Sequence, residues 1–243
     1  MAEAHALLIH GAGGGAWEWN SWRGVLQAHG IAVHAPDLMP SSRGLAATTL
    51  DDYRQQMLEA LLALPPPRVV VGASLGGLLA LQIAAHADAL VLVNPLPPAP
   101  WHGRLPTRDW TEVVPWSCEA RLASTRAALP DADDATSLYA YRRWRDESGA
   151  VLNAAHAGIV VARPRCPLQL IASRVDPDLP SSITQAMSEA WAAPCMQTAA
   201  TSHVGPLLGR EAPSIAASAA AWLARAWQVG SDTGEAATSR SGR

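Results

Sequence analysis

The chain contains no lysine and no phenylalanine. All 18 of its basic residues are arginines, and with 21 acidic residues the formal net charge is −3. The absence of lysine excludes Schiff-base chemistry and the lysine-dependent phosphate loop of P-loop nucleotide-binding proteins. Because the chain has no excess of basic residues, we expect no nucleic-acid partner.

Cysteine is scarce, with three widely spaced residues, Cys118, Cys166 and Cys195, and no CxxC pair. This pattern indicates neither a zinc site nor a disulfide framework. We expect small, mostly buried thiols in a reducing compartment and therefore predict a cytoplasmic protein. The N-terminus lacks the basic segment and long apolar run of a signal peptide. One uncharged stretch, residues 69–85, is interrupted by glycines and is too short for a bilayer span, so we expect no membrane association.

Short apolar segments alternate with segments of helical periodicity, and 49% of the residues are hydrophobic, enough for a sizeable core. The predicted strands cover residues 6–9, 31–35, 69–73, 90–93, 167–172 and 196–199. Continuous apolar strands between helices are typical of a parallel sheet that is covered on both faces. We therefore predict an α/β fold with a mostly parallel sheet of about six strands and helices on both faces.

The alternation stops at Asn94. Residues 95–165 begin with a proline-rich stretch and continue with segments of helical character, without convincing strands. We predict a helical cap insertion there, between two core segments that cover residues 1–94 and 166–229. Residues 230–243 are rich in Ser, Thr and Gly and lack apolar periodicity, which predicts a disordered tail.

The strongest motif is Gly72-Ala73-Ser74-Leu75-Gly76, directly after the predicted strand 69–73 and directly before a helix. A serine in a sharp strand–turn–helix elbow is surrounded so closely by backbone that only glycine fits beside it. The turn exposes the hydroxyl above the sheet. A chance match in a chain rich in Gly and Ala is the alternative, but the flanking elements favour Ser74 as a nucleophile.

A serine nucleophile needs a base, and a carboxylate that orients the base. His203 is the best candidate among the histidines, because it lies in a loop at the carboxyl end of a predicted strand, on the same sheet edge as Ser74. Asp176 follows the strand 167–172 and is the predicted orienting carboxylate. Asp178 is the alternative, and we favour Asp176 because it lies nearer the strand end. The chain order Ser, Asp, His is typical of this elbow.

Two backbone amides are predicted to form an oxyanion hole. One belongs to Leu75, next to the nucleophile, and the other to Ala12, in the glycine-rich loop after the first strand. A plain flexible turn is one alternative for this loop. A dinucleotide-binding loop is another, but the spacing of its glycines does not give the GxGxxG pattern.

These residues resemble the α/β-hydrolase superfamily over residues 6–227. The anchors are His10-Gly11, the elbow, Asp176 and His203. The segment after His10 is similar to the compact esterase and hydroxynitrile-lyase branch best known from plants. Lyases of that branch carry Thr where this chain has Gly11, and Lys where it has Val204, so the resemblance favours an esterase.

The resemblance implies a serine hydrolase that cleaves an ester or thioester of a small or acyl substrate through an acyl-enzyme. It implies no metal or organic cofactor. An acyltransferase or thioesterase that acts on a carrier-bound acyl group, with an acyl-carrier protein as partner, is an alternative, as is a carbon–carbon bond hydrolase. A ligand-binding receptor on the same fold is disfavoured, because a receptor does not need the serine, the histidine and the carboxylate together. Core packing and pocket walls are both open roles for four tryptophans of the cap, Trp101, Trp110, Trp116 and Trp144.

Overall fold

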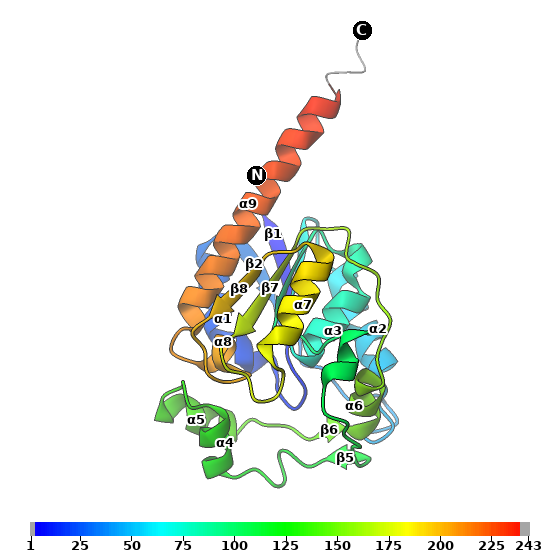
Figure 1. Ribbon diagram of the computed structural model, residues 1–243, viewed down its shortest axis with the longest axis vertical. Helices are drawn as coiled ribbons and strands as arrows, with labels where there is room; N and C mark the ends of the chain where they lie inside the picture. Colours follow the sequence, from blue (N-terminus) through cyan, green and yellow to red (C-terminus); the bar gives the residue numbers. More distant parts are fainter. Residues whose placement is uncertain (1–2, 239–243) are drawn as a thin grey trace.

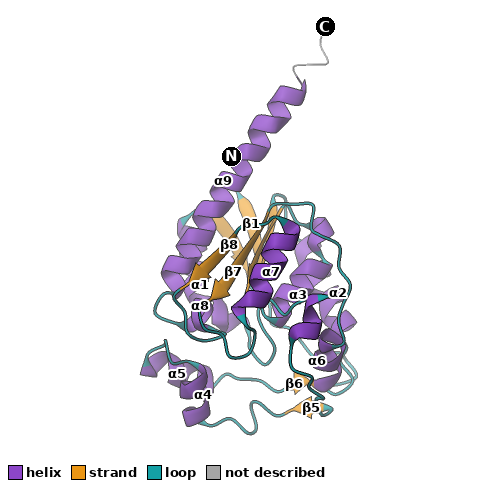
Figure 2. Cartoon of the chain, viewed as in Figure 1, coloured by secondary structure: helices purple, strands orange, loops and turns teal. Residues whose placement is uncertain are grey.

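A computed structural model describes residues 3–238, with side chains as far as residue 226. Six parallel strands form one sheet in the order β2-β1-β3-β4-β7-β8 (Figure 2). The strands are β1 (Ala4–Ile9), β2 (Ile31–His34), β3 (Arg68–Ala73), β4 (Ala89–Val93), β7 (Leu168–Ser173) and β8 (Cys195–Thr198). The predicted α/β class and the six-stranded parallel sheet are confirmed.

Helices cover both faces of the sheet (Figure 1). They are α1 (Asn20–Ala28), α2 (Leu50–Leu62), α3 (Leu75–Gln82), α7 (Ser181–Trp191), α8 (Gly205–Leu208) and α9 (Ala212–Thr238), with short 3₁₀ turns η1 (Ala16–Trp19) and η2 (Ala84–His86). Successive strand residues point to opposite faces, so Leu7 and Ile9 pack with α2, α3 and α7, whereas Ala6 and Leu8 pack with α1 and α9. Because each strand is buried on both faces, its sequence is continuously apolar.

The cap between β4 and β7 is less helical than the sequence predicted. It contains η3 (Trp101–Arg104), β5 (Val113–Val114), α4 (Leu122–Ala128), α5 (Asp134–Tyr141), β6 (Glu147–Ser148) and α6 (Gly149–His156). The strands β5 and β6 pair antiparallel. Tertiary hydrogen bonds replace helical ones where a helix was expected: the amides of Ser117 and Cys118 both donate to the Asp146 carboxylate.

Two further features differ from the sequence-based expectation. The helix α9 continues to Thr238, past residue 230 where the disordered tail was predicted to begin, and that segment contains no proline to interrupt it. The rest of the predicted tail, residues 239–243, lies outside the described residues. Cys118 is exposed rather than buried, and Cys166 and Cys195 are half-buried.

Within residues 3–238, no helix combines the length and the apolar character that a membrane crossing requires.

The elbow glycine Gly76 is required by the close approach of the start of α3 to the end of β1. A Cβ atom at this position would collide with the backbone carbonyl oxygens of Ile9 and His10 at the end of β1. Backbone atoms of a central strand have little freedom to move aside. We therefore expect Gly76→Ala to lower the free energy of unfolding by about 1–3 kcal/mol, measured by denaturant titration.

The matched control is Gly24→Ala in the exposed part of α1, where a Cβ atom meets nothing within 4 Å. Alanine favours the helix there, so stability should rise by up to about 1 kcal/mol. Equal stabilities of the two variants would contradict the close-approach argument.

Candidate active site

Ser74 lies on a strained turn between β3 and α3. Its backbone φ is +52° and ψ is −120°, a conformation that non-glycine residues rarely adopt. The surrounding backbone holds it in place: the Ser74 amide donates to the Val93 carbonyl at 3.1 Å, and its carbonyl accepts from Gly77 and Leu96 at 2.9 Å. The turn directs the Ser74 side chain toward a cavity at the carboxyl edge of the sheet.

His203 and Asp176 are hydrogen-bonded to each other from loops that follow adjacent strands, β8 and β7. The ring Nδ1 of His203 lies 2.7 Å from Oδ2 of Asp176, whose side chain is fully buried. The other carboxylate oxygen of Asp176 accepts the amides of Asp178 and Leu179, each at 2.9 Å. Asp178, the alternative from the sequence, is exposed and makes no such bond to the ring. The geometry therefore favours Asp176.

The environment of His203 favours its protonated form. Burial alone would lower the pKa of the imidazole, but the hydrogen bond and the negative charge of Asp176 outweigh burial and raise the pKa above its usual 6.5. The charge of Asp178 acts in the same direction, and so does Glu18 at a pH where it is ionised. This environment stabilises the positive charge that the His203 ring gains when it accepts a proton.

A cavity of about 670 Å³ opens between the sheet edge and the cap. Ser74 and His203 both line it, together with Ala12 and Leu75, whose amides are the predicted oxyanion donors. No hydrogen bond joins Ser74 Oγ to the His203 ring within the part of the chain that the structure describes. Such contacts are often long without substrate and tighten when it binds.

Three of the four predicted pocket tryptophans line this cavity: Trp110, Trp116 and Trp144. The rings of Trp110 and Trp116 pack edge to face, with centroids 5.8 Å apart. Trp101 is not one of the lining residues. Its ring packs edge to face on Trp191 of α7 at 5.1 Å, so its position indicates a packing role instead.

The loop after β1, residues 10–15, is fixed by a buried neutral histidine; we call it the glycine loop. His10 is fully buried, which lowers its pKa to about 4. Its Nε2 accepts the amide of Leu38 at 2.9 Å, so the ring proton is on Nδ1, which donates to the Gly11 carbonyl at 2.7 Å. The His10-Gly11 pair therefore has a structural function behind the site.

Sequence reasoning missed a buried acid beside this loop. Glu18, in η1, is 2% exposed, and its carboxylate accepts the Gly11 amide at 3.3 Å. Desolvation raises the pKa of this carboxyl to about 8. A glutamate between two tryptophans in a helical stretch resembles an ordinary surface residue, so only the Trp17 and Trp19 neighbours hinted at its burial.

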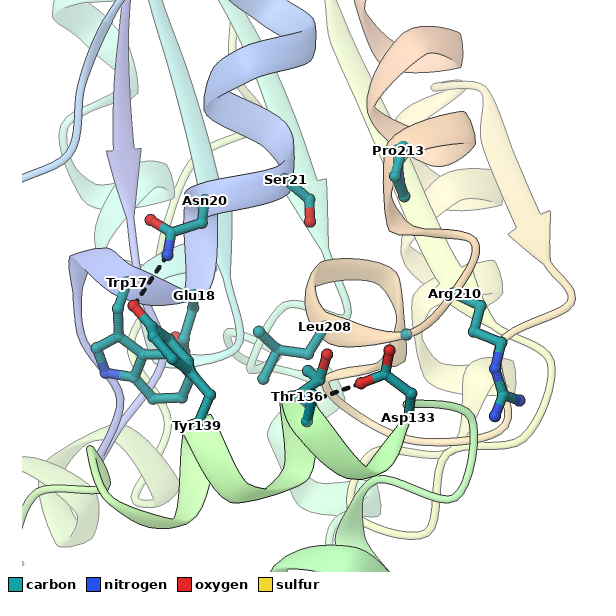
Figure 3. A pocket seen from close by; sticks show the side chains of 12 residues that line it. Trp17, Glu18, Asn20, Ser21, Asp133, Thr136, Tyr139, Leu208, Arg210 and Pro213 are labelled. Atoms are coloured by element: carbon teal, nitrogen blue, oxygen red, sulfur yellow. Dashed lines mark hydrogen bonds between the residues drawn. The ribbon is translucent and has the colours of Figure 1, made fainter.

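Glu18 also borders a second cavity of about 460 Å³, between α5 of the cap and the start of α1 (Figure 3). In this cavity Asn20 donates to the Tyr139 hydroxyl at 3.0 Å, and the Tyr139 ring packs on Trp17. None of Ser74, His203 and Asp176 lines it. The larger cavity is therefore the candidate active site.

The loop that carries His203 is held from two sides. Asn94, at the end of β4, donates to the His203 carbonyl at 2.6 Å and to Ser173 Oγ at 2.8 Å. From the cap, the carboxylate of Asp131 accepts the amide of Thr201 at 2.9 Å and the hydroxyl of Ser202 at 2.7 Å. Only one weak signal in the sequence marks Asn94: the strand alternation stops at this residue.

Asp176, Asp178 and His203 are also the one group of three potential metal ligands in the described part of the chain, with atoms within 4.8 Å of one another. The His203 nitrogen that faces the carboxylates is already hydrogen-bonded to Asp176. A metal ion there would have to break that bond, so the donor set fits a histidine–carboxylate pair better than a metal site.

The raised pKa of Glu18 predicts a pH-dependent stability. A carboxyl with a pKa of about 4.5 when unfolded and about 8 when folded favours folding in its protonated form, so the free energy of unfolding falls as pH rises through this range. Glu18→Gln stays neutral and should gain stability over the native chain by up to roughly 5 kcal/mol between about pH 5 and pH 9, at 1.36 kcal/mol per pKa unit.

Denaturant titrations across the pH range measure this difference. Glu189→Gln, an exposed glutamate on α7, is the control and should follow the native curve. If the free energies of unfolding of Glu18→Gln and of the native chain change with pH in parallel, the Glu18 carboxyl is not held uncharged by burial.

The sequence profile of the "Alpha/beta hydrolase family" matches residues 6–227, so the chain belongs to this family. The predicted family is thereby confirmed.

Curated relatives match parts of the chain. Norfluorocurarine synthase 1 of Strychnos nux-vomica is 40% identical over 81 residues, 31% of this chain and 30% of that protein. Polyneuridine aldehyde esterase of Rauvolfia serpentina is 30% identical over 126 residues, 46% of this chain and 47% of the relative. Methylesterase 3 of Arabidopsis thaliana is 36% identical over 81 residues, 30% of this chain and 31% of the relative. The chain thus spans less than half the length of each of these relatives.

Solved structures share the fold along most of the chain. Tomato methylketone synthase I superimposes with a TM-score of 0.73 and 16% identity, covering 93% of this chain and 99% of that one. Polyneuridine aldehyde esterase superimposes with a TM-score of 0.68 and 19% identity, covering 88% of this chain and 98% of that one. At these identities the similarity shows the fold.

Proposed function

We propose that this protein is a serine hydrolase that cleaves carboxylic esters of small molecules through an acyl-enzyme. The observation that carries the proposal is the pairing of His203 with buried Asp176, 2.7 Å apart, at a cavity that also contains Ser74 on its strained elbow. Membership of the alpha/beta hydrolase family and the names of relatives such as polyneuridine aldehyde esterase and methylesterase 3 support it.

In the proposed reaction, Ser74 Oγ attacks the carbonyl carbon of the ester while His203 Nε2 accepts the hydroxyl proton. The resulting oxyanion accepts hydrogen bonds from the amides of Ala12 and Leu75. Collapse of the intermediate breaks the bond to the alcohol, which takes the proton from His203. Water then attacks the acyl-enzyme while His203 accepts its proton; collapse breaks the bond to Ser74 Oγ, which takes that proton from His203, and the acid is released.

The cavity favours substrates with an apolar body. Trp110, Trp116 and Trp144 give it aromatic walls, and Leu96 and Leu152 add aliphatic surface. A cavity of about 670 Å³ accommodates an acyl group and a leaving group of moderate size. Aromatic or medium-chain acyl esters are therefore the first substrates to test.

The first test is hydrolysis of p-nitrophenyl esters of graded acyl length by the native chain and by Ser74→Ala. Removal of the nucleophile should reduce kcat by about 10⁵-fold or more. A fluorophosphonate probe should label Ser74 in the native protein. Ser42→Ala, an exposed loop serine, is the control and should retain full activity. Undiminished turnover by Ser74→Ala would refute the assignment.

The second test is the pH dependence of kcat/KM. His203 must be neutral to accept the serine proton, so activity should be lost as pH falls, with a midpoint above 6.5 because Asp176 raises the pKa of the ring. Asp176→Asn should shift the midpoint downward and reduce kcat by about 10³–10⁴-fold. An unshifted midpoint in Asp176→Asn would contradict the pairing.

Transfer of the acyl group to another nucleophile is the second outcome to test, with a carrier-bound thioester as donor. Product analysis with and without alcohol, amine and thiol acceptors separates the reactions. Free acid as the sole product, at a rate independent of acceptor, supports hydrolysis; an acceptor-dependent acyl product supports transfer.

A further inference from the structure

The cap contacts the glycine loop through the backbone amide and the backbone carbonyl of one residue, Gly13. The Gly13 amide donates to Oε2 of Glu147 at 3.0 Å, and the Gly13 carbonyl accepts the Arg145 amide at 2.8 Å. Glu147 lies in β6 and Arg145 just before it, far along the chain from the loop that they hold (Figure 1). The Gly13 N–H and the Ala12 carbonyl belong to one peptide unit, so a bond that fixes this unit also restricts the Ala12 amide one unit earlier.

Glu147 is itself fixed and almost completely removed from water, at 2% exposure. Its Oε1 accepts the Tyr53 hydroxyl at 2.9 Å and the Ser148 amide at 2.8 Å, which leaves Oε2 for Gly13. A buried carboxylate is costly unless its oxygens are hydrogen-bonded, so these donors restrict it to one position. Glu147 therefore presents a fixed acceptor to the loop.

The conformation of Gly13 needs such support. Its φ is +67°, and the ring of Trp116 packs where a side chain would be. A glycine has wide conformational freedom, so this loop would sample other conformations without external hydrogen bonds. The side of the loop facing the cavity contains Ala12, which lines the cavity together with Ser74 and Leu75.

We propose that Glu147 of the cap is a positioning residue that holds the glycine loop so that the Ala12 amide faces the oxyanion. This inference rests on the proposed ester hydrolysis. An oxyanion donor contributes only when it is preorganised at the place where charge develops, and small displacements of catalytic groups cost large factors in rate. The cap then contributes to the chemical step as well as to the walls of the cavity.

The test compares Glu147→Ala with Glu147→Gln. Alanine removes every acceptor from Gly13 on this side, so kcat per active site should fall by about 100-fold while KM changes by less than about threefold. Glutamine retains one carbonyl oxygen for Gly13 but places its NH2 group opposite the Ser148 amide, so it should restore only part of the loss. The control is Glu112→Gln, an exposed glutamate just before β5, with kcat unchanged.

Active sites are counted by titration with a p-nitrophenyl phosphonate driven to completion. A purely structural role for Glu147 would lower the melting temperature and the titrated fraction but leave kcat per titrated site at the native value, and that result overturns the proposal.

A transition-state analogue tests the oxyanion directly. An aryl trifluoromethyl ketone forms a hemiketal anion with Ser74, so its affinity should fall across the variants in parallel with kcat/KM. The affinity of the product alcohol, which has no carbonyl oxygen and no negative charge to place in the hole, should stay within about threefold. Equal losses for the analogue and the alcohol overturn the proposal.

Hydrogen exchange of the glycine loop gives a readout that does not depend on turnover. Exchange at these amides should be faster in Glu147→Ala than in the native chain and in Glu112→Gln. A native protein that hydrolyses no ester refutes the proposed function. In that case exchange alone decides whether Glu147 holds the loop: faster exchange supports this contact, and unchanged exchange overturns it.

Discussion

Asp176 carries a carboxylate into a position that water does not reach, and the rest of the site is arranged around it. One of its oxygens pairs with His203 at 2.7 Å, and the other accepts two amides of its own loop. An isolated carboxylate in this position would be strongly destabilising, so the imidazole and the amides are needed for the loop to fold as it does. The same contacts fix the ring plane of His203 and direct it toward the cavity that contains Ser74.

Residues of the cap and of the core both hold the loops that carry the catalytic groups. Asp131 of the cap holds the backbone before His203, Asn94 of the core holds the His203 carbonyl, and Glu147 of the cap holds Gly13. Each of these groups bonds mainly to backbone atoms, whose positions do not depend on the identity of the side chains that line the cavity. The cap and the core are thus hydrogen-bonded to each other at the His203 loop and at the glycine loop.

The sequence predicted the features that depend on local pattern, and missed those that depend on tertiary contacts. Continuous apolar strands and the Gly-x-Ser-x-Gly elbow have periodicity and spacing of their own, so the sheet and Ser74 could be placed. Glu18 has no such pattern, because its burial results from the packing of η1 under the glycine loop. In the cap, side-chain bonds from Asp146 replace helical ones. For Trp101 the sequence left a pocket wall and core packing both open, because its partner Trp191 comes from a distant helix.

The aromatic walls of the cavity and the polar groups that hold its loops are different residues. Trp110 and Trp144 face the cavity, whereas Asp131 and Glu147 bond to backbone behind it. Replacement of a wall residue therefore leaves the anchoring bonds in place. A scaffold of this kind lets substrate preference diverge among descendants by exchange of wall side chains, while the reactive centre is inherited unchanged.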